Sequence, residues 1–334
     1  MNINTFIAVV TYNSEDFIEN CMSSIVNSDF KKWFLAVIDN CSGDSTAERI
    51  AELKAAKSVS SAVLDENNFG FIGLKKNIGF ASAVNWLVFD FLLKENAGLA
   101  RGIKYLVLLN PDVILETTAL GKLVLSFEPD EHGSLSGACY KNAGVIGALI
   151  HDYMQQGSIQ NAGGKIRENY LTYHLQKPPG DKAFYPVDYV SGSVFATRLD
   201  HFIKLSGFDS GYRPLYYEEL DYCLKLKKTG FLSCINADAS AMHYEGASVK
   251  KFSRNFYRHY HKNRIRCMII NSSIRYFFSK FLPAEAQWLK NTASKDQYSA
   301  VLAAYFLNFL FLSYNLLVKL KNLIITANFS RQRL

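Results

Sequence analysis

Short apolar runs alternate with helix-like segments over the first third of the chain. The runs at residues 6–10, 34–38 and 105–109 predict buried strands, and residues 60–65 predict another. Residues 15–27, 45–56 and 81–93 lie between or beside them and show helical spacing of apolar positions. This alternation predicts an α/β fold with a mainly parallel, doubly wound sheet.

Polar loops follow three of the predicted strands, at Thr11–Ser14, Asp39–Asp44 and Asn110–Asp112. Ligands of open α/β sheets bind in the crevice at the carboxyl ends of the strands. We therefore expect these three loops to converge on one edge of the sheet and to form one site.

The pattern changes after about residue 130, where turns containing Gly and Asn continue to about 180. Residues 188–197 predict a loop and a strand. Residues 216–229 predict a helix that begins with acids, ends with lysines and stops at Gly230, an order that complements the helix dipole. From about residue 250 a helical pattern runs to the end, broken near Pro283.

Composition places the chain among ordinary globular proteins. Of its 334 residues, 49% are hydrophobic and 20% are charged, enough for one large domain or a large and a small one without disulfides. The six cysteines are scattered with no metal-ligand spacing, which favours reduced thiols. No secretory signal opens the sequence, so we expect the protein in the cytoplasm.

The net charge of +7 is concentrated near the C-terminus. Residues 249–282 hold no acid and nine basic residues: Lys250, Lys251, Arg254, Arg258, Lys262, Arg264, Arg266, Arg275 and Lys280. This block is suited to an anionic membrane surface, because no nucleic-acid-binding signature accompanies it.

The apolar segment Tyr298–Val318 approaches the length of a membrane span. Asn308, Ser313 and Asn315 interrupt it, which favours a buried or interfacial helix. An oligomerisation face is the alternative.

Asp112 directly follows a predicted buried strand in Leu108-Leu-Asn-Pro-Asp112. A carboxylate in this place can hold a divalent cation on a diphosphate, because hard cations share oxygen ligands with phosphates. The alternative is a turn residue that caps a helix.

Glu218, Glu219 and Asp221 place three carboxylates at the start of a predicted helix. One of them can act as general base on an acceptor hydroxyl, and crowding of like charges raises a pKa towards a useful value. Ordinary helix capping is the alternative.

Two further segments can contact a ligand. His243 follows a strand-like segment and precedes a Gly turn, which permits a second metal or phosphate contact; a structural histidine is the alternative. Asn77–Asn85 is rich in small residues, which allow a ligand to approach the backbone or, alternatively, tight packing of helix on sheet.

The order and spacing of these segments resemble the family 2 inverting glycosyltransferases over residues 5–250. The resemblance implies a GT-A fold at residues 1–250, with a nucleotide-sugar half at about 1–115 and an acceptor half at about 116–250, followed by a helical extension at 251–334. It assigns nucleotide-sugar binding to Thr11, Tyr12, Asn13, Asp39, Asn77, Gly79, Asn85 and Asn110, with Asp39 on the pyrimidine ring. It assigns the metal to Asp112 and His243, the acceptor to Gly192 and Ser193, and catalysis to Glu219, with Asp221 and Glu218 as further candidates.

Two positions depart from the family pattern. Asn110 replaces the first acid of the DxD motif, leaving Asp112 as its only carboxylate, and Glu219 replaces an aspartate. The Asn-Pro-Asp variant is similar to rhamnosyltransferase-like members, which points to dTDP-rhamnose as donor.

The resemblance thus implies a Mg²⁺- or Mn²⁺-dependent inverting transfer from a nucleotide sugar. The acceptor would be a glycan or a polyprenyl-diphosphate-linked sugar, in the synthesis of a bacterial surface polysaccharide such as O-antigen. The expected location is the inner face of the cell membrane, with a homo-oligomer possible and nucleic acid excluded as a partner.

Two other functions fit parts of the pattern. A nucleotidyltransferase also uses an α/β sheet and a carboxylate-bound cation, but it carries a Gly-rich basic signature near the N-terminus that Thr11–Ser14 does not offer. An inactive sugar- or lipid-binding module would explain why Asn110 replaces an acid of the motif. It would not explain why the acids Asp39, Asp112, Glu219 and Asp221 are retained.

Overall fold

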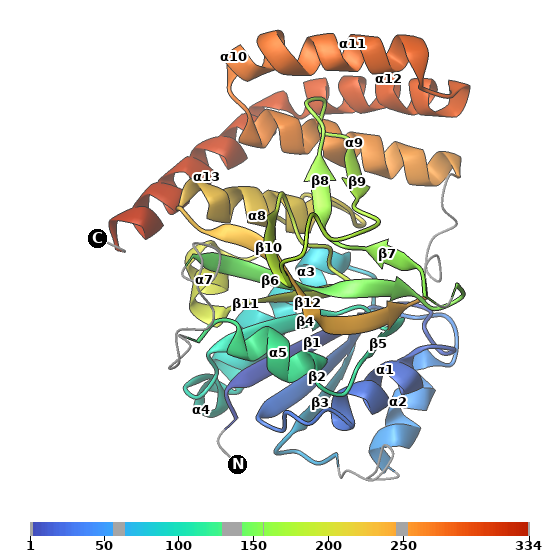
Figure 1. Ribbon diagram of the computed structural model, residues 1–334, viewed down its shortest axis with the longest axis vertical. Coiled ribbons are helices and arrows are strands. Elements are labelled where there is room, and N and C mark those ends of the chain that lie inside the picture. The colour runs from blue at the N-terminus through green and yellow to red at the C-terminus, as the bar shows by residue number, and fades with distance from the viewer. Residues whose placement is uncertain (1–2, 56–63, 129–141, 156, 245–252, 333–334) are drawn as a thin grey trace.

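The computed structural model describes residues 3–55, 64–128, 142–155, 157–244 and 253–332. One large sheet forms the centre, and the C-terminal helices form a layer at the end of the molecule opposite the N-terminus (Figure 1). The strands are β1 (Thr5–Thr11), β2 (Trp33–Asp39), β3 (Phe69–Gly73), β4 (Tyr105–Leu109), β5 (Val113–Leu115), β6 (Ala143–Asp152), β7 (Ile159–Asn161), β8 (Gly164–Ile166), β9 (Thr172–His174), β10 (Phe184–Val187), β11 (Val194–Arg198) and β12 (Leu232–His243).

The helices lie on both faces of the sheet and beyond its end. They are α1 (Ile18–Val26), α2 (Thr46–Ala55), α3 (Phe80–Asn85) with its π-helical continuation Trp86–Glu95, α4 (Ala97–Ala100), α5 (Ala119–Leu125), α7 (Leu199–Lys204), α8 (Glu218–Lys228), α9 (Arg254–Asn271), α10 (Ile274–Tyr276) with the π-helical turn Phe277–Phe281, α11 (Leu282–Asn291), α12 (Lys295–Leu310) and α13 (Leu312–Arg331).

The sheet has the strand order β10-β12-β6-β11-β4-β1-β2-β3. The strands β4, β1, β2 and β3 are parallel, as the sequence pattern predicts. Beyond them β11 is antiparallel to both β4 and β6, while β12 is parallel to β6. The α/β fold is confirmed, and the second half of the sheet is mixed.

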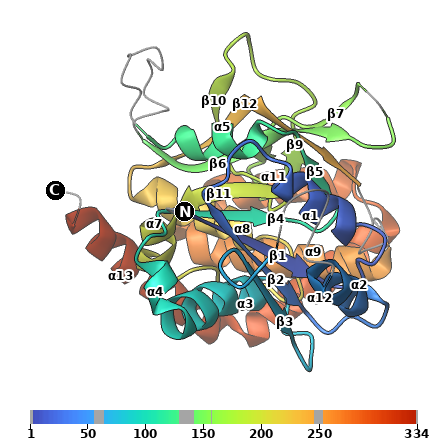
Figure 2. The same cartoon turned by 90° about the horizontal axis from the view of Figure 1, so that it is seen from below.

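Both faces of the first strands are covered, which explains their continuous apolar sequence. In β1 the alternate residues Phe6, Ala8 and Val10 join one core with α3. Ile7 and Val9 join a second core with α1, α2 and α5 on the opposite face. Figure 2 shows α3 on one side of these strands and α1 and α2 on the other.

The third strand differs from the prediction. The strand beside β2 is Phe69–Gly73, not residues 60–65, of which 60–63 lie outside the described residues. Because β3 is at the edge of the sheet, most of its residues are only partly buried, and two glycines weaken its apolar pattern.

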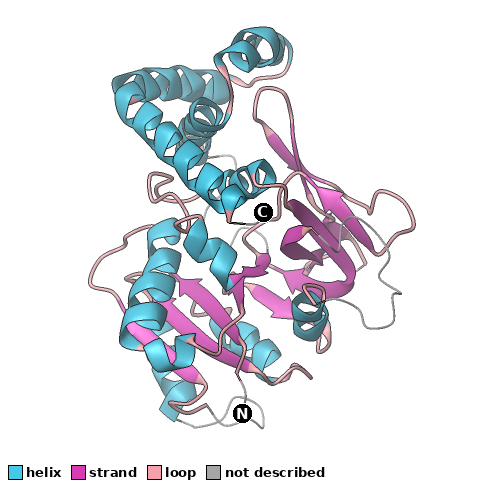
Figure 3. Cartoon of the chain, turned by 90° about the vertical axis from the view of Figure 1, so that its left-hand side faces the viewer, coloured by secondary structure: helices cyan, strands magenta, loops and turns pink. Residues whose placement is uncertain are grey.

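Figure 3 shows the C-terminal helices stacked together at one end, and ion pairs join them to one another and to the rest of the chain. Arg264 of α9 is fully buried and binds both carboxylate oxygens of Glu285 of α11. Arg266 of α9 lies 2.6 Å from Asp209, just before α8. The expectation that the whole basic block faces a membrane is therefore wrong for Arg264 and Arg266, because their charges are neutralised inside the protein.

The apolar segment 298–318 is not one helix, because α12 ends at Leu310 and α13 begins at Leu312. In the part of the chain that the structure describes, no single helix is long and apolar enough to cross a membrane. Taken together, α12 and α13 have the length and the apolar composition of a membrane span, but the two helices are bent by 74° relative to each other. The expected boundary near residue 250 lies in 245–252, outside the described residues.

Candidate active site

The carboxyl ends of the central strands meet at one edge of the sheet. Thr11 at the end of β1 pairs with Asp39 at the end of β2, and Leu109 at the end of β4 pairs with Val194 at the start of β11. The residues that follow or precede these four strand ends are therefore neighbours. They include most of the positions that the sequence pattern selects.

Asp39 holds the loop that follows β2. Its Oδ1 accepts hydrogen bonds from Thr11 Oγ1 at 2.9 Å and from Ser42 Oγ, and its Oδ2 accepts from Ser42 N at 3.0 Å. Both oxygens are thus engaged within the protein. A further contact of Asp39 with a pyrimidine ring stays a prediction.

The loop after β1 is joined to this loop by reciprocal bonds. Asn13 N donates to Ser42 Oγ at 2.9 Å, and Asn13 Oδ1 accepts from Gly43 N at 2.8 Å. Asn13 has a φ of 52°, a left-handed conformation that asparagine tolerates better than most residues. Tyr12 next to it is 42% exposed, so its ring is free to contact a ligand.

Asn77 and Gly79 connect the strand ends to the loop before α8. Asn40, directly after β2, donates to Asn77 Oδ1 at 3.1 Å and accepts from Ile78 N at 2.8 Å. Gly79 has a φ of 83°, and a Cβ there would lie 3.2 Å from the carbonyl oxygen of Pro214. A glycine is therefore required for this close approach.

Asn85 holds part of the segment that precedes α8. Its Nδ2 donates to Phe208 O at 2.8 Å and its Oδ1 accepts from Phe208 N at 2.9 Å. The carboxamide thus holds the Gly207-Phe208-Asp209 segment, and a Cβ on Gly207 would overlap it. A further contact of Asn85 with a nucleotide sugar stays a prediction.

Glu219 lies against the start of β11. Its carboxylate accepts a hydrogen bond from Gly192 N, and a Cβ on Gly192 would overlap its Oε1. Ser193, the next residue, accepts a hydrogen bond from Asn110 N at 3.1 Å. Glu219, Gly192, Ser193 and Asn110 are therefore brought together from α8, β11 and β4.

Burial raises the pKa of Glu219 to about 7, although the Gly192 amide opposes this shift. Glu219 remains partly exposed, whereas Glu218 is only 2% exposed. Burial and the nearby Glu219 charge raise the pKa of Glu218 well above its ordinary range. Of the two, Glu219 is the carboxylate that combines access with a pKa suited to proton transfer near neutral pH.

The turn before α8 is strained. Tyr216 and Tyr217 have φ values of 80° and 79°, which cost about 1–3 kcal/mol each for residues other than glycine. Asn263 of α9 stabilises the turn by donating to Leu215 O at 2.9 Å and to Tyr216 O at 3.1 Å. Helix α9 therefore fixes the direction in which α8 presents Glu219.

Asp221 is separated from this cluster. Two residues along a helix are roughly 200° apart around its axis, so Asp221 points away from the side that carries Glu219. Its Oδ1 accepts from Asn271 Nδ2 at 2.6 Å, and its Oδ2 lies 3.6 Å from Lys225 Nζ. Asp221 is fully buried and holds α8 to α9.

Asp112 and His243 meet on the other side of Asn110. Asp112 Oδ1 lies 3.2 Å from His243 Nε2, and His243 at the end of β12 pairs with Val113 of β5. His243 Nδ1 lies 2.7 Å from Gln160 Oε1. Gln160 is therefore a third member of this group, because its Oε1 accepts a hydrogen bond from Nδ1 and so orients the imidazole ring.

The donors of this group fit a divalent cation. Asp112 Oδ1 is buried and lacks a hydrogen-bond partner, and it lies beside a histidine nitrogen that Gln160 orients. A carboxylate oxygen and an imidazole nitrogen are both ligands of Mn²⁺, and the carboxylate also suits Mg²⁺. Within the described residues, no group of three or more His, Cys, Asp or Glu side chains is placed to hold a metal, so a cation here would also need oxygen ligands from a diphosphate or water.

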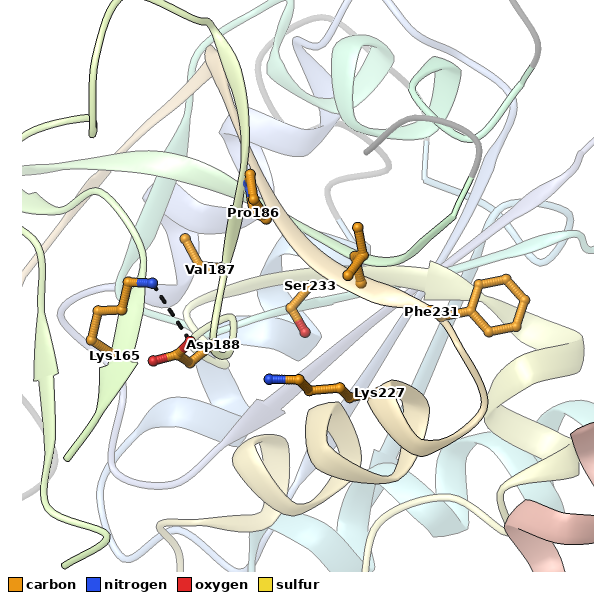
Figure 4. Close-up of a pocket in the computed structure, with 8 residues that line it drawn as sticks. Lys165, Pro186, Val187, Asp188, Lys227, Phe231 and Ser233 are labelled. Atoms are coloured by element: carbon orange, nitrogen blue, oxygen red, sulfur yellow. Dashed lines mark ion pairs between the residues drawn. The ribbon is translucent and has the colours of Figure 1, made fainter. Parts of the chain in front are cut away.

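Two cavities lie apart from these residues. One, of about 230 Å³, is lined by Lys165, Asp188, Lys227 and Ser233 among others, with Lys165 Nζ 3.5 Å from Asp188 Oδ1 (Figure 4). The other, of about 310 Å³, lies between α13 and the segment 205–209. Neither is lined by a residue that the sequence pattern selects for the site.

Comparison with known sequences identifies relatives for most of the chain. The profile of the family described as Glycosyl transferase family 2 matches residues 6–198. Rhamnosyltransferase WbbL of Escherichia coli (strain K12) is 23% identical over 263 residues, which are 78% of this chain and 91% of that protein. The N-acetylglucosaminyl-diphospho-decaprenol L-rhamnosyltransferase of Mycobacterium tuberculosis (strain H37Rv) is 24% identical over 278 residues, 77% of this chain and 81% of that protein.

Solved structures share the fold. GalNAc-T7 with UDP, GalNAc and Mn²⁺ aligns with a TM-score of 0.58 at 13% identity, over 91% of this chain and 54% of that chain. This chain thus spans about half the length of GalNAc-T7. TarS residues 1–349 from S. aureus with UDP-GlcNAc aligns with a TM-score of 0.56 at 15% identity, over 99% of this chain and 92% of that chain. These glycosyltransferase neighbours confirm the GT-A fold with a C-terminal helical extension.

Proposed function

Because the chain belongs to glycosyl transferase family 2, we propose that it transfers a sugar from a nucleotide diphosphate to an acceptor hydroxyl, with inversion at the anomeric carbon. One observation carries this proposal. The end of β4 and the start of β11 bring Glu219, through Gly192, to the edge that also presents Asp112 and His243. Glu219, as the proton acceptor, and Asp112 with His243, as the cation-binding pair, thus lie near the place where the end of β4 meets the start of β11.

Glu219 is the general base of the proposed reaction. The acceptor oxygen forms a bond to the anomeric carbon while its proton passes to the Glu219 carboxylate. The bond between that carbon and the phosphate oxygen breaks, and the nucleoside diphosphate leaves. A pKa of about 7 suits this step, because the carboxylate is ionised near neutral pH and still basic enough to take the proton.

Asp112 and His243 would hold a divalent cation, which when bound neutralises charge on the diphosphate. Gln160 orients His243 for this task through the contact at Nδ1. Asn110 leaves Asp112 as the only acid of its triplet, so the protein supplies a single negative charge there. Mn²⁺ in the GalNAc-T7 structure supports the assignment of a cation.

The relatives support a narrower donor and acceptor. Two of them are named rhamnosyltransferases, and one of these is named for an N-acetylglucosaminyl-diphospho-decaprenol acceptor. We infer dTDP-rhamnose as donor and a polyprenyl-diphosphate-linked sugar as acceptor, in the synthesis of a bacterial surface polysaccharide. The reaction would take place at the cytoplasmic face of the membrane, where both substrates are accessible.

Release of nucleoside diphosphate tests the proposal. The protein is incubated with Mn²⁺ and, separately, dTDP-rhamnose, UDP-GlcNAc or GDP-mannose, with and without a synthetic polyprenyl-diphosphate acceptor. We expect slow hydrolysis of one donor alone and faster transfer with the acceptor, with both lost in Glu219→Gln. Nucleotide binding without release from any donor would instead favour a binding module and contradict the proposal.

A further inference from the structure

The C-terminal helices α12 and α13 expose their apolar side chains. Of the twenty-two large hydrophobic residues that are exposed among the described residues, sixteen lie between 274 and 324. On α12 and α13 they include Phe306, Phe309, Leu310, Phe311, Leu317 and Leu320, each at least 55% exposed. So many exposed apolar side chains on two consecutive helices mark an interaction site.

The opposite side of the same helices is buried and carries polar residues beside the apolar Ala300, Val301, Ala304 and Phe329. Asn308, Asn315, Asn322 and Thr326 are each at most 6% exposed. Asn308 donates to Lys262 O at 3.0 Å, Asn315 donates to Asn308 Oδ1 at 3.0 Å, and Arg266 donates to Asn315 Oδ1. Apolar side chains therefore lie on both the inward and the outward side of these helices, whereas a surface helix of a globular protein usually carries them on the inward side alone.

Asp296 at the start of α12 is paired with Arg254, and the sequence beyond it carries charge of one sign. Residues 297–334 contain Lys319, Lys321, Arg331 and Arg333 but no Asp or Glu. Of these, Lys319 donates to Ile269 O and Ser272 O, whereas Lys321 and Arg331 are exposed on α13. A second copy of this chain would bring like charges together, whereas the headgroups of an anionic lipid layer would pair with them.

We propose that the outward side of α12 and α13, which we call the α12–α13 apolar face, inserts in the plane of an anionic membrane leaflet. The inference rests on the proposed function in one respect, because it places the enzyme beside a lipid-linked acceptor. Because α12 and α13 are bent by 74° relative to each other, they would run in two different directions along the membrane surface. Phe309 and Phe311 lie at the bend and are 73% and 59% exposed. We therefore expect the bend to be the part of the face that inserts most deeply into the leaflet.

The apolar face is joined to the candidate site through rigid contacts. Helix α12 packs on α9, and Asn263 of α9 holds the turn that presents Glu219. Arg266 of α9 links Asn315 of α13 to Asp209. Insertion of the face therefore fixes the orientation of the site relative to the membrane surface.

Co-flotation of the full-length protein with vesicles tests the proposal. We expect binding to vesicles with about one third phosphatidylglycerol and weaker binding to pure phosphatidylcholine. The triple variant Phe309→Ser/Leu317→Ser/Leu320→Ser should lower the partition coefficient by roughly tenfold or more. Leu125→Ser is the matched control, because Leu125 on α5 is 60% exposed and lies outside the apolar face.

Two results would overturn the proposal: flotation of the triple variant as efficient as that of the wild type, or a wild type that stays in solution with both vesicle types. A dimer in light scattering that the triple variant turns into a monomer, without any vesicle binding, would assign the face to a second copy. Thermal stabilisation by dTDP and Mn²⁺ is measured on the same variants. Its absence in all of them, with vesicle binding intact, would contradict the proposed function and leave the membrane face standing.

Discussion

At the scale of single residues, the site depends on how the environment changes two side chains. Glu219 is a carboxylate whose pKa burial raises to about 7. His243 is an imidazole held between Gln160 and Asp112. We propose that Glu219 takes a proton and that His243 binds a cation, and each is held in place by a neighbouring residue, Gly192 or Gln160.

Replacing Glu219 by glutamine should separate catalysis from stability. Transfer should fall by about 10²–10⁴-fold while donor binding persists, since only proton transfer is lost. Because the pKa of Glu219 in the folded protein, about 7, exceeds its ordinary value of 4.5, wild-type stability declines as pH rises between these values. Glu219→Gln removes that decline.

We therefore expect the melting temperature of Glu219→Gln, relative to wild type, to be higher at pH 8 than at pH 4.5. Initial rates and thermal melts at both pH values measure the two effects. An equal difference in melting temperature at the two pH values would show that the Glu219 pKa is not raised.

Gln160→Met should weaken cation binding without touching the cation directly. Loss of the acceptor for His243 Nδ1 frees the imidazole to rotate and change tautomer, which typically costs about 10–100-fold in metal affinity. Titration with Mn²⁺ followed by electron paramagnetic resonance measures the affinity. Gln155→Met is the control, because Gln155 is exposed; equal Mn²⁺ affinities in both variants would remove Gln160 from the site.

At the scale of elements, the site is formed where the start of β11 passes the start of α8. Gly192 allows this passage, because no space remains for a Cβ beside Glu219. The strained turn at Tyr216 and Tyr217 aims α8 at the same point. Helix and strand together define the position of Glu219.

Gly192→Ala should thus reduce transfer by at least about tenfold, because a displaced base loses its geometry. Binding of dTDP, measured by calorimetry, should change little. Gly98→Ala is the control, since a Cβ on Gly98 meets no atom within 4 Å. Wild-type activity in Gly192→Ala would show that the contact with Glu219 is not needed.

The strands that carry strong apolar runs could be predicted from the sequence, and with them the edge where Thr11, Asp39 and Asn110 lie. The edge strand β3 could not, because its glycines and partial exposure leave a weak pattern. Gln160 comes from β7, a three-residue strand in a stretch without periodicity, so no sequence signal marks it. The separation of Asp221 from Glu219 follows from helix geometry alone.

At the scale of the whole molecule, polar contacts run from the catalytic half into the C-terminal helices. Arg266 is central to them, because it binds Asp209 and Asn315 and stacks over the Tyr212 and Tyr314 rings. This arrangement makes the C-terminal helices part of the fold that supports the site.

Arg266→Met should lower the free energy of unfolding by more than about 1 kcal/mol, because Asp209, whose side chain is only 12% exposed, is left without its partner. Arg254→Met is the control, since Arg254 pairs with Asp296 at the surface, with the Arg254 side chain 87% exposed, and should cost at most about 1 kcal/mol. Urea unfolding measures both. A similar loss in the two variants would show that the buried pair does not hold the helices in place.

Anomalous diffraction from a crystal grown with dTDP and Mn²⁺ tests the central claim most directly, namely that the acids from the two halves of the chain serve one site. We predict a manganese peak bound by Asp112 and His243, with the diphosphate between the metal and the Gly192–Glu219 contact. Metal and diphosphate bound on a different part of the molecule from Glu219 would contradict the account.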